Sequence, residues 1–240
     1  MNTSSCLAYA LETSGTAGSV ALVADERVLA ERPFAKGLRH GTDLVPALDA
    51  VVRLASVNRR SVHLVVVGTG PGSYTGLRVG LASAKALAFA LGVPLVGVPS
   101  SDAAVYNLAP ESSRHAAVVV DAKRDYVYLS LYVAHGDDWK PDGDRRILPP
   151  REAAKCIPPG SSIIGDGAVR YHEVFAAAGH VILDKVSAVP AAGCLGILGI
   201  RKFRSSGIDE LLIVEPLYLR LSEAEERRLA RKTPGGQSTT

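Results

Sequence analysis

A glycine-rich segment in the first half of the chain has the residue types of a ligand-binding turn: Gly68-Thr69-Gly70-Pro71-Gly72-Ser73-Tyr74-Thr75-Gly76-Leu77-Arg78-Val79-Gly80. It lies between an apolar strand and a helix, where glycines let the backbone approach a ligand or another backbone closely. The N–H groups and positive dipole end at a helix start also suit an anion. However, the segment lacks the glycine spacing and the Gly-Lys-Ser/Thr of a P-loop. Tyr74 also stands where the dinucleotide-binding fingerprint needs a small residue.

The cysteines and histidines form no pattern of their own. Cys6, Cys156 and Cys194 are scattered and show no C-x-x-C spacing, so neither a disulfide framework nor a cysteine metal site is expected. The histidines after His40 are isolated along the chain and lack the spacing of metal ligands. The sequence also supports no Ser/His/Asp or Cys/His arrangement. We therefore predict no catalytic residue and no metal site.

The segment from Gly70 to Gly80 resembles the signature G-P-G-S-[FY]-T-G-[LV]-R-[IV]-G of the TsaB family, bacterial proteins needed to make threonylcarbamoyladenosine in tRNA. Two other segments are similar to family motifs: Asp121–Tyr128 to D-A-R-x-x-x-V-Y, and Glu215–Arg220 to P-x-Y-L-R. The resemblance spans about residues 6–221. It defines a signature loop with these residues: Gly70, Pro71, Gly72, Ser73, Tyr74, Thr75, Gly76 and Arg78.

The resemblance implies a non-catalytic subunit that pairs with the threonylcarbamoyl transferase TsaD and stabilises it. It also implies self-association as a homodimer, access to the ATPase subunit TsaE through the complex, and only indirect contact with tRNA. TsaD binds a metal through an H-x-x-x-H pair, whereas here Leu44 stands four residues after His40. The resemblance therefore implies no metal and no other cofactor in this chain.

The order of predicted elements indicates an α/β protein. Three strands, a helix, a strand, a helix, a strand and a helix are predicted at 6–11, 19–24, 27–34, 42–56, 64–67, 77–91, 93–98 and after Ser100. A similar order starts again at Ala116 and runs to Leu183. We expect two ribonuclease-H-like domains of the actin-like ATPase (ASKHA) superfold, at residues 1–110 and 111–221. From composition, we expect residues 222–240 to form a charged, disordered tail.

Two helical stripes in the first domain predict a surface for a partner. Small residues at one end of a stripe permit close helix approach, and leucines at the other provide burial. The predicted interface residues are Leu44, Leu48, Val51 and Val52 in the first helix and Gly80, Ser83, Ala84 and Leu87 in the second. The alternative is that both stripes face the sheet of their own domain.

Charge and composition limit the other partners. The net charge is +3, but basic residues concentrate in the tail, and aromatic residues make up only 5% of the chain. Both features argue against a surface built to stack nucleic-acid bases. No apolar run approaches the roughly 20 residues of a membrane span. We expect a cytoplasmic protein without a membrane partner.

Two other function classes stay open. A divergent nucleotide-dependent kinase or ATPase of the same superfold would use Glu12 for Mg²⁺ and a turn at Asp121 for phosphates, with Gly165-Asp166-Gly167 beside the adenosine. Lys123 stands where that phosphate turn needs glycine, which counts against this reading. A glycoprotease-like peptidase is the other alternative, and the missing metal pair counts against it.

Overall fold

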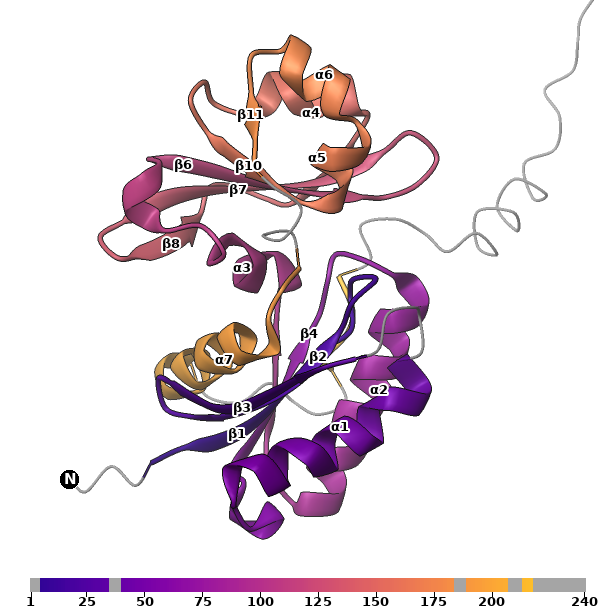
Figure 1. The fold of residues 1–240 in the computed structure, drawn as a ribbon, viewed down its shortest axis with the longest axis vertical. Helices are drawn as coiled ribbons and strands as arrows, with labels where there is room; N and C mark the ends of the chain where they lie inside the picture. Colours follow the sequence, from indigo (N-terminus) through magenta and orange to yellow (C-terminus); the bar gives the residue numbers. More distant parts are fainter. Residues whose placement is uncertain (1–4, 35–39, 184–188, 207–212, 218–240) are drawn as a thin grey trace, which may run out of the picture.

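The structure is a computed structural model that describes residues 5–34, 40–183, 189–206 and 213–217. Two α/β units lie one above the other, each built on its own β-sheet (Figure 1). The chain passes from the first sheet to the second through helix α3 (Ser100–Val105). It then returns to the first sheet with helix α7 (Ala192–Ser206).

The first sheet has the strand order β3-β2-β1-β4-β5. The first three strands are antiparallel neighbours, and β4 and β5 run parallel to β1. Strands β1 and β4 are buried along their whole length, as expected for apolar strands covered on both faces. The bounds are β1 (Leu7–Glu12), β2 (Ser19–Ala24), β3 (Arg27–Pro33), β4 (Leu64–Gly68) and β5 (Leu95–Val98).

Helices cover both faces of the first sheet. One core contains alternate residues of β1 and β4 together with helices α1 (His40–Ala55) and α2 (Tyr74–Leu91). The other core contains the intervening strand residues together with α7. This alternation follows from the two-residue period of a strand. A short 3-10 helix, η1 (Arg59–Ser61), follows α1.

The second sheet has the order β11-β10-β6-β7-β8, with β9 also paired to β7. Its strands are β6 (His115–Asp121), β7 (Val127–His135), β8 (Asp138–Pro141), β9 (Arg146–Leu148), β10 (Ser162–Ile164) and β11 (Val181–Ile182). Its helices are η2 (Pro110–Ser112), α4 (Pro150–Cys156), α5 (Asp166–Arg170) and α6 (His172–Ala177). Leu129 and Phe175 are fully buried in the core between this sheet and α4 to α6.

The bounds predicted for the second domain, residues 111–221, differ from the way the chain packs in the structure. Helix α7 contacts all five strands of the first sheet, and the Leu217 N–H donates to the Thr69 carbonyl at 2.8 Å. Both segments therefore pack on the first domain. The sequence pattern also missed α7 as a helix, because Gly193, Gly196 and Gly199 lower its helix propensity. The predicted tail lies outside the described residues.

None of the described helices combines the length and the apolar character needed to cross a membrane.

Candidate protein-interaction site and its supporting loop

The signature loop connects β4 to α2 and is anchored at both ends. Ser73 caps α2, because its hydroxyl accepts a hydrogen bond from the Gly76 N–H at 3.2 Å. Gly70 has φ +95°, a left-handed conformation that favours glycine, and the Gly70–Pro71 peptide is cis. The Arg78 guanidinium lies 4.2 Å from the centre of the Tyr74 ring, which fixes both side chains on the first turns of α2.

The glycines of this loop make room for the turn between β1 and β2 of the same chain. A Cβ on Gly72 would lie 2.3 Å from the Ser14 carbonyl oxygen, and a Cβ on Gly76 would lie 2.1 Å from that of Thr13. A Cβ on Gly80 would lie 2.1 Å from Thr13 Oγ1. Gly76 and Gly80, four residues apart, lie on one face of α2, and Gly72 lies just before its start. The space beside these glycines, which the sequence analysis offered to a ligand or a partner, is thus occupied by the chain's own Thr13–Ser14 turn.

Two hydrogen bonds hold this contact. Thr13 Oγ1 donates to the Gly76 carbonyl at 2.8 Å in a buried position, and the Ser73 N–H donates to the Ser14 carbonyl at 2.6 Å. The second bond uses an N–H at the start of α2 that an anion would otherwise bind. The structure therefore favours a structural role for the signature loop over an anion site.

Glu12 ends β1 directly below the signature loop and is fully buried. Its Oε1 accepts a hydrogen bond from the Ser14 N–H at 2.6 Å, while no described group has hydrogen-bond geometry to Oε2. A Cβ on Gly68 would lie 2.2 Å from that Oε2, so the carboxyl packs against the backbone. Burial raises the pKa of Glu12, although hydrogen bonding from Ser14 and Ser100 lowers it in part. At 0% exposure, Glu12 presents no surface to a Mg²⁺ ion in this structure.

The buried carboxyl predicts a pH-dependent stability. Because the pKa of Glu12 is raised on folding, the folded state binds the proton more tightly, and stability falls as pH rises above the ordinary value of 4.5. We expect Glu12→Gln to unfold at a higher urea concentration than the parent at about pH 7.5, and this advantage to shrink toward about pH 4.5. Glu111→Gln, at an exposed position, is the control. An advantage that does not change with pH contradicts the assignment.

The corresponding turn of the second domain is closed by its own side chains. Asp121 is the last residue of β6, and its side chain is 4% exposed. Its Oδ2 pairs with Lys123 Nζ at 2.6 Å and with Arg170 at 3.4 Å. Lys123, Arg124 and Asp125 all have positive φ values, so the turn is tight without a glycine. This arrangement offers a nucleotide phosphate no glycine cradle.

The Gly165-Asp166-Gly167 turn has a structural role that the described contacts explain. Asp166 Oδ1 accepts a hydrogen bond from the Asp121 N–H at 2.9 Å, and burial raises the pKa of Asp166. A Cβ on Gly165 would lie 2.0 Å from the Val119 carbonyl oxygen. The turn therefore packs directly on the end of β6.

Two histidines of the described part make hydrogen-bond contacts within the fold. His63 Nδ1 accepts a hydrogen bond from the Leu7 N–H at 3.1 Å, and His180 Nε2 lies 2.8 Å from the Ala154 carbonyl oxygen. Nothing is described of the His40 side chain. Within the described ranges, no group of three or more His, Cys, Asp or Glu residues is arranged to hold a metal ion.

The structure divides the predicted interface residues into two groups. Leu44, Val51, Gly80 and Ala84 are buried in the chain's own first domain, so they present no surface to a partner. Their stripe faces the sheet, which is the alternative that the sequence left open. The other four are only partly buried: Leu48, Val52, Ser83 and Leu87.

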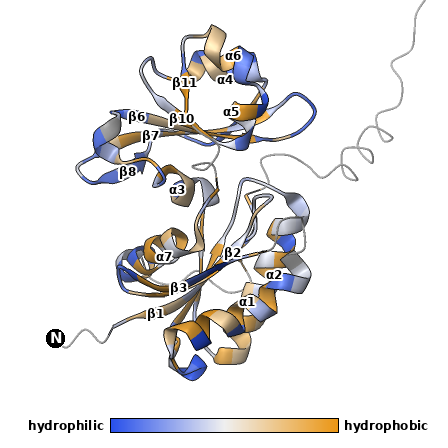
Figure 2. Cartoon of the chain, viewed as in Figure 1, coloured by the Kyte–Doolittle hydropathy of each residue, from blue (hydrophilic) through white to orange (hydrophobic). Residues whose placement is uncertain are grey.

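The residues predicted from the two stripes did not include three large apolar side chains that are exposed on the same helices. Phe89 of α2 is 81% exposed, and Val45 and Leu54 of α1 are 68% and 66% exposed. Apolar residues extend along both helices in Figure 2. The signal available in the sequence was the presence of large apolar residues off the main stripe of an amphipathic helix. A contiguous patch of such side chains is typical of protein–protein contact.

The chain is similar in sequence to known proteins. Residues 33–188 match the family model described as TsaD, tRNA N6-adenosine threonylcarbamoyltransferase. An uncharacterised protein of Mycobacterium tuberculosis is 35% identical over 169 residues, covering 70% of this chain and 74% of that protein. The tRNA threonylcarbamoyladenosine biosynthesis protein TsaB of Bacillus subtilis is 32% identical over 127 residues, covering 51% of this chain and 53% of its own length.

A solved structure extends the likeness to both domains. YeaZ from Pseudomonas aeruginosa superposes with a TM-score of 0.75 at 27% identity, over 89% of this chain and all of that one. Together with the two sheets, this match confirms the predicted fold class, two ribonuclease-H-like domains of the actin-like ATPase superfold.

Proposed function

Because the chain belongs to the TsaD family, on its TsaB branch, we propose that it is a non-catalytic subunit in the formation of threonylcarbamoyladenosine in tRNA. In this proposal it binds a TsaD-type transferase and stabilises the active conformation of that partner by mass action. The partner carries out the transfer of the threonylcarbamoyl group to N6 of a tRNA adenosine. The proposed location is cytoplasmic, and tRNA is contacted only through the complex.

One observation carries this proposal: the positions that would serve a nucleotide are filled by the chain itself, while large apolar side chains of α1 and α2 remain exposed. Glu12 is fully buried, and Asp121 is paired with Lys123. Phe89, in contrast, is 81% exposed on the helix that the signature loop positions. This combination suits a binding partner better than an independent enzyme.

The proposed interface consists of the outward side chains of α1 and α2: Val45, Leu48, Val52, Leu54, Ser83, Leu87 and Phe89. It modifies the interface expected from sequence, because the buried residues of the stripes are left out. The same surface would also serve a homodimer, and TsaE would join through the TsaD-type partner. Pairing with TsaD and self-association would then compete for one face.

Co-purification with the cognate TsaD tests the pairing. We expect an untagged chain to elute with affinity-tagged TsaD at equal stoichiometry and to leave the resin when TsaD is omitted. Failure to co-elute at micromolar concentrations of both proteins would contradict the proposal.

Titration with Mg²⁺–ATP separates this function from a divergent kinase or ATPase. Because Glu12 is buried and Asp121 is paired, we expect the isolated chain to give no saturable heat at nucleotide concentrations up to about 1 mM. A stoichiometric binding curve would favour the kinase alternative. Cleavage of a glycoprotein substrate by the metal-loaded chain would favour the peptidase alternative instead.

A further inference from the structure

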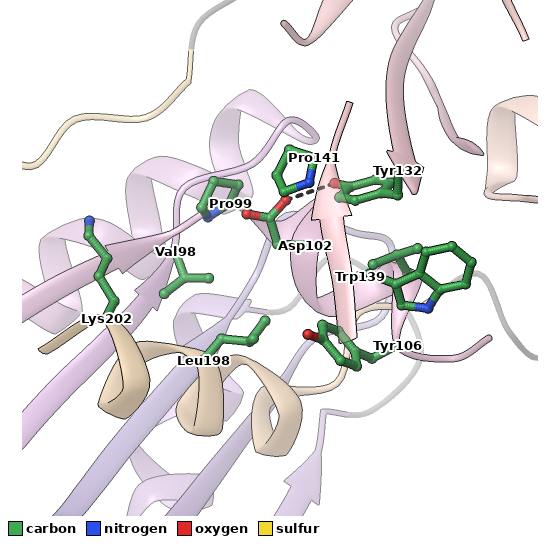
Figure 3. Close-up of a pocket in the computed structure, with 10 residues that line it drawn as sticks. Val98, Pro99, Asp102, Tyr106, Tyr132, Trp139, Pro141, Leu198 and Lys202 are labelled. Carbon is green, nitrogen blue, oxygen red and sulfur yellow. Dashed lines mark hydrogen bonds between the residues drawn. The ribbon is translucent and has the colours of Figure 1, made fainter. Parts of the chain in front are cut away.

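Helix α3 is wedged between the two domains. It packs against α7 on the first domain and against β6 and β8 on the second. A cavity of about 180 Å³ opens beside it, lined from the first domain by Val98, Leu198 and Lys202 and from the second by Tyr132, Trp139 and Pro141 (Figure 3). Any rotation of one domain relative to the other must therefore change the contacts around α3.

One polar network joins α3 to the second domain. Asp102 of α3 forms an ion pair with Arg145, and the Tyr132 hydroxyl donates to Asp102 Oδ1 at 2.8 Å, as Figure 3 shows for the tyrosine. Arg145 Nε also donates to the Ser101 hydroxyl at 3.1 Å. The Arg145 and Asp102 side chains are 20% and 24% exposed, so solvent screens this pair less than a surface ion pair.

A second network joins α7 of the first domain to both domains at once. Arg201 of α7 donates from Nη2 to Glu26 Oε2 at 2.7 Å, in the turn between β2 and β3. Its Nη1 donates to Asp138 Oδ1 of β8 at 2.9 Å. The Tyr106 hydroxyl, directly after α3, donates to the same Asp138 oxygen at 2.8 Å. These hydrogen bonds lower the pKa of Asp138, and the bond from Tyr106 has the largest effect. The Asp138 carboxylate therefore stays charged.

We propose that these two networks form an interdomain clamp, defined as Asp102, Tyr132, Asp138, Arg145 and Arg201, that holds the two domains at a fixed angle. Two-domain proteins that bind ligands in the cleft commonly close by rotation about a hinge. Here such a rotation would pull Asp138 away from Arg201 on one side of α3 and would shear the Asp102 network on the other. A single exposed ion pair would hold little, but each charge of this clamp has at least two partners.

The distance between spin labels on the two domains tests the clamp in the full chain. Arg60→Cys in η1 and Glu173→Cys in α6 place labels at exposed sites of the first and second domains. Cys156→Ser removes one native thiol. The other two react slowly with the label, because Cys6 is buried and because burial raises the pKa of Cys194 to about 12. Pulsed electron resonance then gives the distribution of the interdomain distance.

We expect one narrow distance distribution in the labelled parent and a distribution about twofold wider in Arg201→Leu and in Asp102→Ala. Arg204→Leu is the matched control, because Arg204 lies one turn along α7 and pairs with Asp25 within the first domain. If Arg201→Leu fails to fold, Asp138→Ala removes only the second-domain partner of Arg201. A broad distribution in the parent, or clamp variants as narrow as the control, would overturn the proposal.

Discussion

Gly76→Ala is expected to destabilise the chain by about 3 kcal/mol, and Gly80→Ala by about 1 to 2 kcal/mol. The added methyl group meets the backbone carbonyl of Thr13 in the first variant and the Thr13 hydroxyl in the second, each at 2.1 Å. A backbone atom cannot move without shifting β1, whereas a side chain can rotate. Urea unfolding of both variants measures the difference.

Thr13→Ala provides the internal control for this pair. Alone it removes the buried hydrogen bond to the Gly76 carbonyl, at a cost of about 1 kcal/mol. Combined with Gly80→Ala, it also removes the atom that the new methyl group meets, so most of the Gly80→Ala effect should disappear. Combined with Gly76→Ala, it leaves the opposing carbonyl in place, so that cost should persist. Equal relief of both glycine variants would show that the turn contact is not what the signature glycines accommodate.

Phe89→Asp is expected to weaken binding to the cognate TsaD at least about 100-fold, because a charge replaces the most exposed large apolar side chain of the proposed interface. Since Phe89 is 81% exposed in the isolated chain, the stability of that chain should change by less than about 0.5 kcal/mol. Titration calorimetry with TsaD gives the affinity, and urea unfolding gives the stability.

Val181→Asp is the matched control for this variant. Val181 is 67% exposed but lies on the edge strand β11 of the second domain, away from α1 and α2. We expect it to bind TsaD like the parent. Equal loss of binding in both variants, or no loss in Phe89→Asp, would place the partner on another surface.

Most of the first domain could be predicted from sequence because its signals are local. The strands β1, β2 and β4 are continuous apolar runs that end in polar turns, and the structure finds them within a residue or two of the expected bounds. Helix α7 could not be found in the same way. Its glycines suit close packing on the sheet but resemble a loop in the sequence.

The sequence did not separate the buried residues of the predicted interface from the partly exposed ones. An amphipathic stripe identifies the face of a helix that is buried, and for Gly80 and Ala84 that burial is against the chain's own domain. Which glycine opposes which atom depends on the Thr13 turn, 63 residues from Gly76, which no local pattern reports. Only the folded chain brings these two segments together, and their contact explains why the loop needs its glycines.

Reconstituted tRNA modification tests the central proposal most directly. Purified TsaD, its ATPase subunit, threonylcarbamoyl adenylate and unmodified tRNA are combined with and without this chain, and threonylcarbamoyladenosine is quantified by mass spectrometry. On this proposal, product forms only when TsaD and this chain are both present, this chain alone forms none, and the reaction with the Phe89→Asp variant resembles the one without the chain. Product formed by this chain without TsaD, or a TsaD rate that does not depend on this chain, would contradict it.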